Sequence, residues 1–509
     1  MISSLLPRPS LRSGAAALAA GALLAAGGVR TARAGSFSLS DQSPSAVGLS
    51  FAGAAASASD PSTIFFNPAS MGFLPGFQTE SSYTYISPRA DFQNDGSRYV
   101  NPALGGLPIR GSNGGGAARG ASFGDTFLSA TLFNSETYGK FNLGIAITVP
   151  FGEVVDYDSN WVGRYSSLRS QLRTIDYGLS ASYRWKFISV GAGFDAQYAS
   201  AVLSNAVDFG LLGAGLRIPG QRPGGSDGVV RLEGSDVSYG FNVGGILEYL
   251  QPGQIPGLGT GRVGVSYRSG ITQVFDGYVT FRNVPAFALS PGFGGAFQGQ
   301  RATAKLALPE VYNFSFSQGF LNDRLTFLGS LTYTLWGRLQ QIPIDFSNPA
   351  SQAALVSDPA LNRPGLAIRY HDAVRLTGGF EFKPFKDLTL RVGGGWDESP
   401  VQDQYTRSSR IPDGDRWLVS TGLKYHAFGF RNPIFKSLYV DTDIELAYLH
   451  LFLNDPQITN LDNSGHLVNG RYDAQVNIVS AALIFRYGAA DKPAAPAPKD
   501  GKESFTYRK

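Results

Sequence analysis

The chain carries long stretches in which apolar and polar side chains alternate with a period of two residues. In residues 174–185 the odd positions place isoleucine, leucine, alanine, tyrosine and tryptophan on one face, whereas the even positions include Asp176 and Arg184. The same alternation recurs in residues 324–335, 374–383 and 438–448. Because successive side chains of a β-strand point to opposite faces, each stretch predicts a strand with one apolar and one polar face.

This pattern predicts an all-β chain of fourteen strands. An even number of strands lets an antiparallel barrel close with both chain ends on one side. Several connections are long and rich in Gly, Pro and Ser, as the outer loops of membrane barrels are, whereas the tight turn at Lys186 is typical of their periplasmic end. The predicted strands span residues 77–89, 125–133, 139–149, 174–185, 187–203, 236–250, 261–282, 301–319, 324–339, 371–383, 387–396, 415–426, 438–451 and 473–487.

Alternation alone fits two architectures: a soluble β-sandwich with its charges in water, and a transmembrane barrel with its apolar residues toward lipid. Many predicted strands have the length that crosses a bilayer, about 9–11 residues, whereas soluble strands average about five or six. Aromatic residues, which collect at membrane–water interfaces, also stand at strand ends: Tyr183, Trp185, Tyr249, Trp336, Trp396, Trp417 and Tyr487. We therefore predict a 14-stranded antiparallel transmembrane β-barrel over residues 77–487.

Residues 1–34 predict a cleavable signal peptide, which also favours the barrel. Arg8 and Arg12 precede an apolar stretch at residues 14–28, and Ala32-Arg33-Ala34 forms an A-x-A cleavage site. The alternative is a membrane anchor, but the stretch is short for a spanning helix.

Removing this segment changes the charge of the chain. It carries four of the 43 basic residues and none of the 39 acidic ones, so the mature chain is formally neutral. A nucleic-acid partner is not expected without a concentrated basic surface. The chain also has no cysteine, so disulfides do not stabilise it.

Two further segments fall outside the predicted barrel. Residues 35–76 are rich in small residues, and we interpret them as a hatch that fills the lumen, with a disordered arm as the alternative. A 14-stranded barrel encloses more space than its inward side chains fill. Residues 488–509 are rich in Ala, Pro and Lys and predict a disordered tail.

The sequence offers no arrangement for catalysis. It has four histidines and lacks the G-x-S-x-G, H-E-x-x-H and P-loop motifs, so we expect neither an enzyme nor a cofactor or metal. One acidic cluster alternates along a predicted strand at Asp441, Asp443 and Glu445. It fits either a cation site or a lumen wall paired with Arg391 or Arg486.

Several motifs resemble the FadL/TodX family of outer-membrane transporters for long-chain fatty acids and aromatic hydrocarbons. Residues 46–53 read AVGLSFAG, and residues 60–71 read DPSTIFFNPASM, in which Asn67, Pro68 and Ala69 resemble the hatch signature of the family. Later segments extend the resemblance to about residues 35–487: WVGRY at 161–165, LRTID at 172–176, LPE at 308–310, DESPV at 397–401 and RIPDGDR at 410–416.

The resemblance implies a barrel with an N-terminal hatch, diffusion rather than energised pumping, and lateral release of ligand into the bilayer at a kink in the third strand. In this chain that strand meets Pro150, Phe151 and Gly152. Proline removes a ladder donor and glycine permits a bulge, so a break is expected here. The alternative is that Pro150 only ends the strand.

The family also implies an interior ligand pocket that the N-terminus enters. We expect the hatch aromatics Phe37, Phe51, Phe65, Phe66 and Phe73 in or near this pocket, although these rings could instead pack the hatch against the wall. Residues 198–208 and 339–346, which match the stretches where fatty-acid members place cations, hold no Lys or Arg. We therefore expect a hydrophobic compound without a required carboxylate. If the ligand does require a carboxylate, the cations to examine first are Arg164, Arg338 and Arg375.

The expected function is passive uptake of a hydrophobic small molecule through the outer membrane of a Gram-negative cell. A general porin for polar solutes and a structural or adhesive surface barrel are the alternatives. The expected partners are the ligand, outer-membrane lipid, and the periplasmic chaperone and barrel assembly machinery during biogenesis. We expect a monomer.

Overall fold

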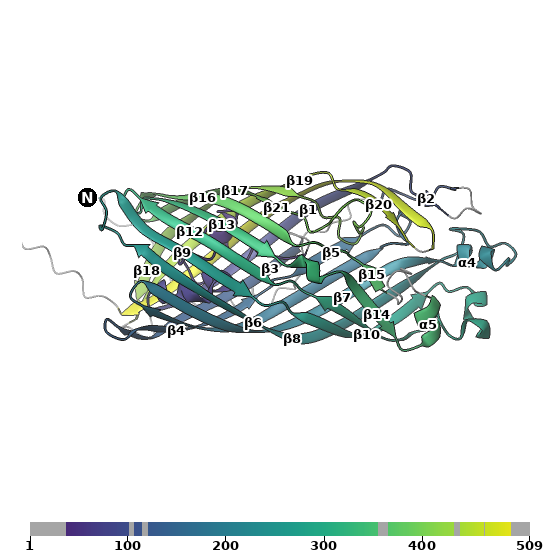
Figure 1. Ribbon diagram of the computed structural model, residues 1–509, viewed down its shortest axis with the longest axis horizontal. Coiled ribbons are helices and arrows are strands. Elements are labelled where there is room, and N and C mark those ends of the chain that lie inside the picture. Colours follow the sequence, from purple (N-terminus) through teal and green to yellow (C-terminus); the bar gives the residue numbers. More distant parts are fainter. Residues whose placement is uncertain are drawn as a thin grey trace, which may run out of the picture.

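A computed structural model describes residues 37–100, 106–114, 121–354, 365–431, 438–462 and 464–489. Its main feature is a closed antiparallel ring of fourteen strands, in which the last strand pairs with the first (Figure 1). The ring consists of β1 (Phe77–Asn94), β3 (Ala121–Ser135), β4 (Gly139–Thr148), β6 (Arg169–Trp185), β7 (Ile188–Asp208), β8 (Asp227–Leu250), β9 (Leu258–Arg268), β12 (Val311–Phe320), β13 (Leu325–Thr334), β16 (Ala373–Phe385), β17 (Leu388–Asp397), β18 (Arg416–Arg431), β19 (Leu438–Leu453) and β21 (His466–Ala489). The predicted fourteen-stranded barrel is thus confirmed.

Shorter strands lengthen the wall at one end of the ring. They are β5 (Gly152–Asp156), β10 (Thr272–Arg282), β11 (Gln300–Ala307), β14 (Gln341–Phe346) and β15 (Gly365–Ala367), while β2 (Arg98–Tyr99) and β20 (Gln457–Leu461) pair with β21. The continuous strands predicted at 261–282 and 301–319 are therefore wrong in detail, because the wall is interrupted at residues 269–271 and 308–310. Pro309 in the second interruption has no N–H to donate to a ladder.

The side chains of the ring follow the membrane pattern. Tyr177 and Leu179 of β6 are exposed on the outside, whereas Asp176, Ser180 and Ser182 of the same strand are buried inside. A soluble sandwich would show the reverse arrangement. Among the described residues, no helix has the length and apolar composition to cross a membrane.

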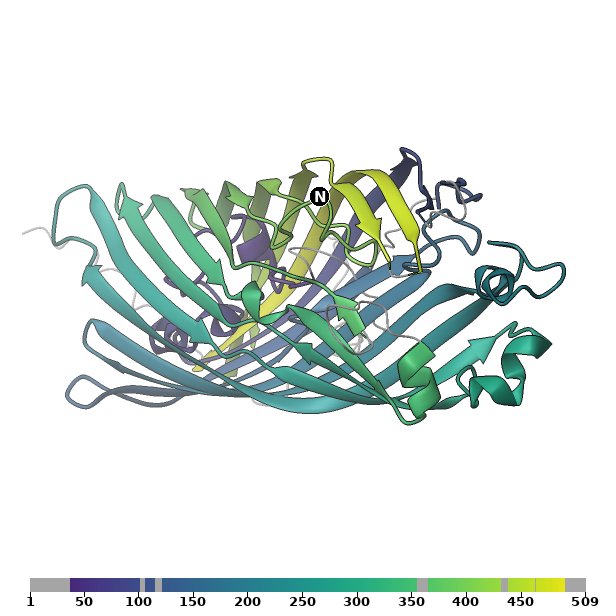
Figure 2. The same ribbon diagram turned by 45° about the vertical axis from the view of Figure 1, so that its right-hand side comes forward.

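The two ends of the ring differ. Tight turns, such as the one through Lys186 with a φ of 55°, join strands at the end where β1 begins and β21 ends. Long connections at the other end carry α4 (Phe209–Gly215), η3 (Ala286–Leu289), η4 (Pro291–Phe293) and α5 (Pro349–Ala354) (Figures 1 and 2). We expect the end with the tight turns to face the periplasm.

The N-terminal hatch lies inside the ring, as three short helices shown in purple in Figure 2. They are α2 (Pro44–Val47), α3 (Thr63–Phe66) and η1 (Pro68–Phe73). The predicted signal peptide at 1–34 lies outside the described residues, as does nearly all of the predicted tail, and both stay predictions.

The hatch fits against the wall at positions that lack side chains. A Cβ on Gly191 would lie 2.5 Å from the backbone nitrogen of Ala69, and one on Gly244 would meet the side chain of Asn67. Gly264 and Gly393 approach the hatch backbone at Ala55 and Leu49 in the same way. We call Gly191, Gly244, Gly264 and Gly393 the glycine notches. They let the hatch come into direct contact with four strands of the ring, the neighbours β7, β8 and β9 and the separate strand β17.

Candidate functional site

Asn67 joins the hatch to itself and to the wall. It is fully buried, and its Oδ1 accepts a hydrogen bond from the backbone N–H of Ala69 at 3.0 Å, which caps η1 with Pro68 in the first helical turn. Its Nδ2 donates to the carbonyl of Ala55 at 2.7 Å and to the wall carbonyls of Gly245 and Val265, each at 3.3 Å. The motif therefore holds two hatch turns together against β8 and β9.

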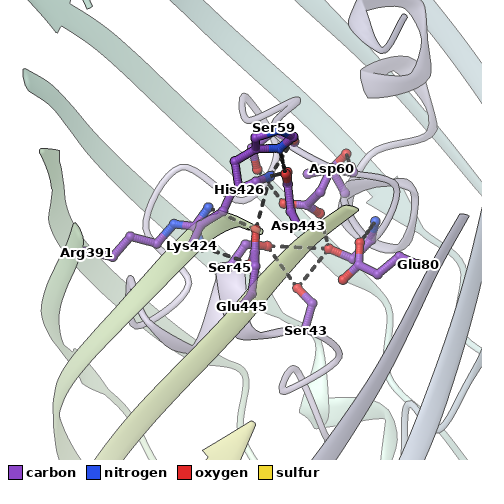
Figure 3. A network of polar contacts seen from close by, with 12 residues as sticks. Ser43, Ser45, Ser59, Asp60, Glu80, Arg391, Lys424, His426, Asp443 and Glu445 are labelled. Carbon is purple, nitrogen blue, oxygen red and sulfur yellow. Dashed lines mark hydrogen bonds and ion pairs between the residues drawn. The ribbon is translucent and has the colours of Figure 1, made fainter. Parts of the chain in front are cut away.

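A network of charged groups holds the other side of the hatch (Figure 3). Lys424 of β18 lies 3.1 Å from Glu445 and donates to the backbone carbonyl of Ser59 in the hatch. In the hatch itself, Asp60 accepts from Ser59 and Ser62, while the backbone N–H of Ser62 donates to Glu80 of β1 at 3.0 Å.

This network resolves the alternatives left open for the acidic cluster. Glu445 pairs with Arg391 at 2.9 Å, and Asp443 pairs with Arg486. The structure thus shows the paired lumen wall. Lys424 was not predicted from the sequence, because only the register of β18 against β19 places it opposite Glu445.

The third ring strand is broken at Pro150. β4 ends at Thr148 and β5 begins at Gly152, and both pair with β6, so the strand resumes after the break instead of ending there. No ladder joins β5 to β3 within the part of the chain that the structure describes. Residues 121–125 of β3 pair with β1 but not with residues 148–152, and we call this break in pairing the gap between β3 and β5.

Residues 37–39, here called the N-terminal segment, occupy this gap. The N–H of Leu39 donates to the carbonyl of Pro150 at 2.8 Å, and the N–H of Gly152 donates to the carbonyl of Phe37 at 2.9 Å. Ser38 thereby forms an antiparallel bridge with Phe151. The segment satisfies backbone groups that the missing β3–β5 ladder would have paired.

An apolar pocket opens beside the N-terminal segment. Phe37 lines it and is only 2% exposed, and its ring packs edge-on against Trp336 at 4.9 Å and near Phe151 at 6.1 Å. Other lining side chains are Leu172, Leu232, Phe275, Leu306, Ile342 and Ile368. Phe37 thus belongs both to the segment that fills the gap and to the wall of the pocket.

The other hatch aromatics lie elsewhere. Phe51, Phe65 and Phe66 line a second cavity deeper in the lumen, here called the central cavity. Phe73 lies at neither cavity, because the guanidinium groups of Arg184 and Arg262 cover its ring at 3.9 and 4.4 Å. Phe73 thus anchors the hatch through cation–π contacts, and its expected place in a ligand pocket stays a prediction.

The apolar pocket does contain a cation, contrary to expectation. Arg410, from the loop between β17 and β18, lines it together with Glu153 of β5, and its guanidinium donates to Asn205 at 3.0 Å and Ser170 at 3.2 Å. Burial lowers the pKa of Arg410 to about 10, and the charge of Glu153 opposes this effect. Arg410 is the first residue of the RIPDGDR motif. Its place in the apolar pocket could not be predicted, because the motif is distant in sequence from the strands that line the pocket.

The three cations proposed from the sequence have other positions. Arg164 pairs with Asp227 at 2.7 Å in the outer loops, and Arg338 pairs with Glu310 at 3.2 Å. Arg375 lines the central cavity. None of the three lines the apolar pocket.

A closed ring with an apolar outer surface and a filled lumen defines an integral outer-membrane β-barrel of the plugged type. The chain belongs to the family described as outer membrane protein transport protein (OMPP1/FadL/TodX), which matches residues 25–487. Outer membrane protein P1 of Haemophilus influenzae is 26% identical over 427 residues, covering 80% of this chain and 85% of the relative. The long-chain fatty acid transport protein of Escherichia coli O6:H1 is 26% identical over 437 residues, covering 81% and 86%.

Solved structures share the fold. A Pseudomonas aeruginosa FadL homologue superposes with a TM-score of 0.74 at 22% identity, covering 89% of this chain and 99% of the other. The Ralstonia pickettii toluene transporter TbuX superposes with a TM-score of 0.54 at 15% identity, covering 88% and 98%. The protein is therefore an outer-membrane barrel of a transport family.

Proposed function

We propose that this barrel carries hydrophobic small molecules across the outer membrane by diffusion and releases them sideways into the bilayer through the gap between β3 and β5. The observation that carries the proposal is that the N-terminal segment contacts both the gap and the apolar pocket. The residues that fill the gap also place Phe37 in the apolar pocket. Displacing the segment would open the pocket to the gap in a single movement.

The chemistry of the pocket supports a hydrophobic ligand. Its walls are mainly leucine, isoleucine and phenylalanine, as small-molecule sites with few polar anchors are. Two relatives carry names of the same chemistry, a long-chain fatty acid transport protein and a toluene transporter. The two classes of ligand share an apolar body, and the pocket fits that shared property.

A general porin for polar solutes is disfavoured by the hatch, whose buried contacts occupy the lumen. Single-channel conductance separates the two functions. The proposed transporter should conduct ions poorly, and a large stable conductance of the wild-type protein would favour the porin.

A reversible crosslink tests lateral release. Ser38 and Phe151 face each other as a non-hydrogen-bonded antiparallel pair, a geometry with closely spaced Cα atoms that suits a disulfide. The Ser38→Cys/Phe151→Cys variant has no competing thiols, because the chain contains no cysteine. Oxidation should stop uptake of a radiolabelled hydrocarbon or fatty acid by cells, and reduction should restore it.

Two controls make this test specific. Ser38→Cys alone cannot form the crosslink and should be insensitive to oxidant. Leu128→Cys/Ile145→Cys joins register partners of β3 and β4, whose pairing need not change, and should also transport in both redox states. Undiminished uptake by the fully oxidised Ser38/Phe151 pair would exclude the gap as the exit.

A further inference from the structure

The central cavity combines aromatic walls with polar groups. It lies between the hatch and the wall formed by β8, β9, β12, β13, β16 and β18. Its aromatic side chains are Phe51, Phe65, Phe66, Phe151, Tyr267 and Trp336. Phe151 and Trp336 also contact Phe37, so the central cavity adjoins the apolar pocket across this aromatic group.

One guanidinium group in the central cavity has spare donor capacity. Arg268 and Arg416 line the cavity but are paired with carboxylates, at 3.0 Å to Asp195 and 2.7 Å to Asp397. Arg375 forms no such ion pair with any described residue. Its Nη1 donates to Ser40 at 3.1 Å, its guanidinium lies 4.6 Å from the ring of Phe51, and its buried Nε has no acceptor.

One carboxyl group in the same cavity has spare acceptor capacity. Asp41 of the hatch is 0% exposed, and neither of its carboxyl oxygens has a hydrogen-bond partner among the described residues. The backbone carbonyl of Asp41 is held separately by Thr84 of β1 at 3.0 Å. Burial raises the pKa of Asp41 to about 7, against the attraction of Arg375 and Arg416.

Buried polar groups in proteins are almost always paired, and leaving one unpaired costs about 1–3 kcal/mol. A donor and an acceptor that both lack partners therefore indicate what kind of molecule this cavity would accommodate. The molecule must accept from the Nε of Arg375 and donate to the carboxyl group of Asp41. A single hydroxyl group does both.

We propose that the central cavity binds aromatic compounds that carry a hydroxyl group, that is, phenols. The ring would lie among the aromatic side chains of the cavity, and the hydroxyl group would lie between Asp41 and Arg375. This inference rests on the proposed function, because it names a substrate class for the same transport route.

Other ligand classes match the cavity less well. A hydrocarbon would shield Asp41 and Arg375 from water without giving either a partner. A carboxylate could accept from the Nε of Arg375 but has no proton to donate to the carboxyl group of Asp41. A cation would meet three arginines. A neutral hydroxyl group avoids each of these penalties.

Matched ligands test the proposal on the full-length barrel in lipid nanodiscs, by titration calorimetry corrected for partition into empty discs. The ligands are p-cresol, p-xylene, in which a methyl group replaces the hydroxyl, and 4-methylanisole, whose oxygen accepts but cannot donate. Hydrogen bonds to charged groups are among the stronger ones, so p-cresol should bind at least about tenfold more tightly than either of the others.

Two variants assign the preference to its groups. Asp41→Leu and Arg375→Met should each bring p-cresol close to p-xylene, and the double variant should show little further loss, because one hydroxyl group bridges both side chains. Arg324→Met, in an exposed turn, is the matched control and should keep the full preference.

The outcomes are distinct. Equal binding of p-cresol and p-xylene by the wild-type barrel would overturn the phenol site and leave hydrophobic transport standing. A preference that survives both variants would also overturn it, because the hydroxyl group would then be recognised elsewhere. Binding of none of the three ligands would also overturn the phenol site, whereas the proposed function is decided separately by the uptake assay with the Ser38/Phe151 crosslink. The 4-methylanisole comparison needs no variant and so does not depend on how the substituted barrels fold.

Discussion

Replacing Asn67 with alanine should unseat the hatch while the ring stays closed. The substitution removes the acceptor of the Ala69 N–H and the donor to the Ala55 carbonyl. Ala55 and Ala69 are both fully buried, so neither backbone group gains water as a replacement. At about 1–3 kcal/mol for each of these two buried groups left unpaired, the loss is about 2–6 kcal/mol. The hydrogen bonds between the strands of the ring are not affected by this loss.

Asn67→Asp makes a sharper test, because it preserves size. The introduced carboxylate can still accept from Ala69, but its second oxygen would face the carbonyls of Ala55, Gly245 and Val265 without a proton to donate. This arrangement raises the pKa of the introduced group in the seated hatch. Seating should therefore be retained at acidic pH, where the group is protonated, and lost as the pH rises through that raised pKa.

The assay is single-channel conductance in a planar bilayer, with resistance of the folded barrel to denaturation on gels as the measure of the ring. Channels formed by the Asn67→Ala variant should open frequently, whereas channels formed by the wild-type protein should stay closed. Two adjacent glycines of β8 serve as a matched pair. A Cβ on Gly244 would collide with Asn67, but one on Gly245 has its nearest neighbour at 3.7 Å.

Gly244→Ala should therefore reproduce the conductance of Asn67→Ala, and Gly245→Ala should behave like the wild-type protein. Closed channels and normal uptake in both Asn67→Ala and Gly244→Ala would refute the reasoning, since the hatch would then not depend on this contact.

Three further predictions concern the ligand path. Phe37→Ala should weaken ligand binding by about 10–100-fold, since burying a phenylalanine contributes about 1.5–3 kcal/mol, with little change in barrel melting temperature; unchanged affinity in titration calorimetry would mean that Phe37 only packs the segment. A matched fatty acid and its methyl ester should bind the wild-type barrel within about threefold, because Glu153 offsets Arg410 in the apolar pocket, and Glu153→Gln should shift the preference toward the acid by about fivefold or more. Burial in the seated state, in which the N-terminal segment occupies the gap, raises the pKa of Asp41 to about 7. The seated state therefore favours protonated Asp41, so it should be most stable below about pH 4 and lose stability as the pH rises to about 7. Hydrogen exchange at the Leu39 amide, corrected for its intrinsic pH dependence, should therefore show less protection at pH 8 than at pH 5, and Asp41→Asn should remove the difference.

The period-two pattern was sufficient to predict the ring because lipid imposes it on every spanning strand. Where the wall leaves the bilayer, this constraint ends, and the prediction loses accuracy. β1 continues to Asn94 and β21 begins at His466, several residues beyond the predicted limits, and there polar groups of neighbouring loops pair with the strands. The interruptions at 269–271 and 308–310 escaped notice because the alternation continues on either side of them.

The positions of individual site residues depended on partners that are distant in sequence. Phe37 could be placed from its position near the expected start of the mature chain. Phe73 could not, because the two arginines that cover it come from β6 and β9. Arg410 reaches the apolar pocket from a loop, and only the three-dimensional closure of the outer end brings it beside Glu153.

The glycine notches also have a consequence for assembly. A pairing error of one residue in a notch strand would turn its side chains to the other face, and an error of two would move the notch along the wall by about 7 Å. At Gly264 of β9 the hatch would then meet a side chain where it now meets backbone, because every residue within two positions of Gly264 carries one. Seating of the hatch therefore depends on the correct register of β9, and its docking reports on that part of the completed barrel. A misregistered barrel would retain an open lumen, and leakage would distinguish it from the finished protein.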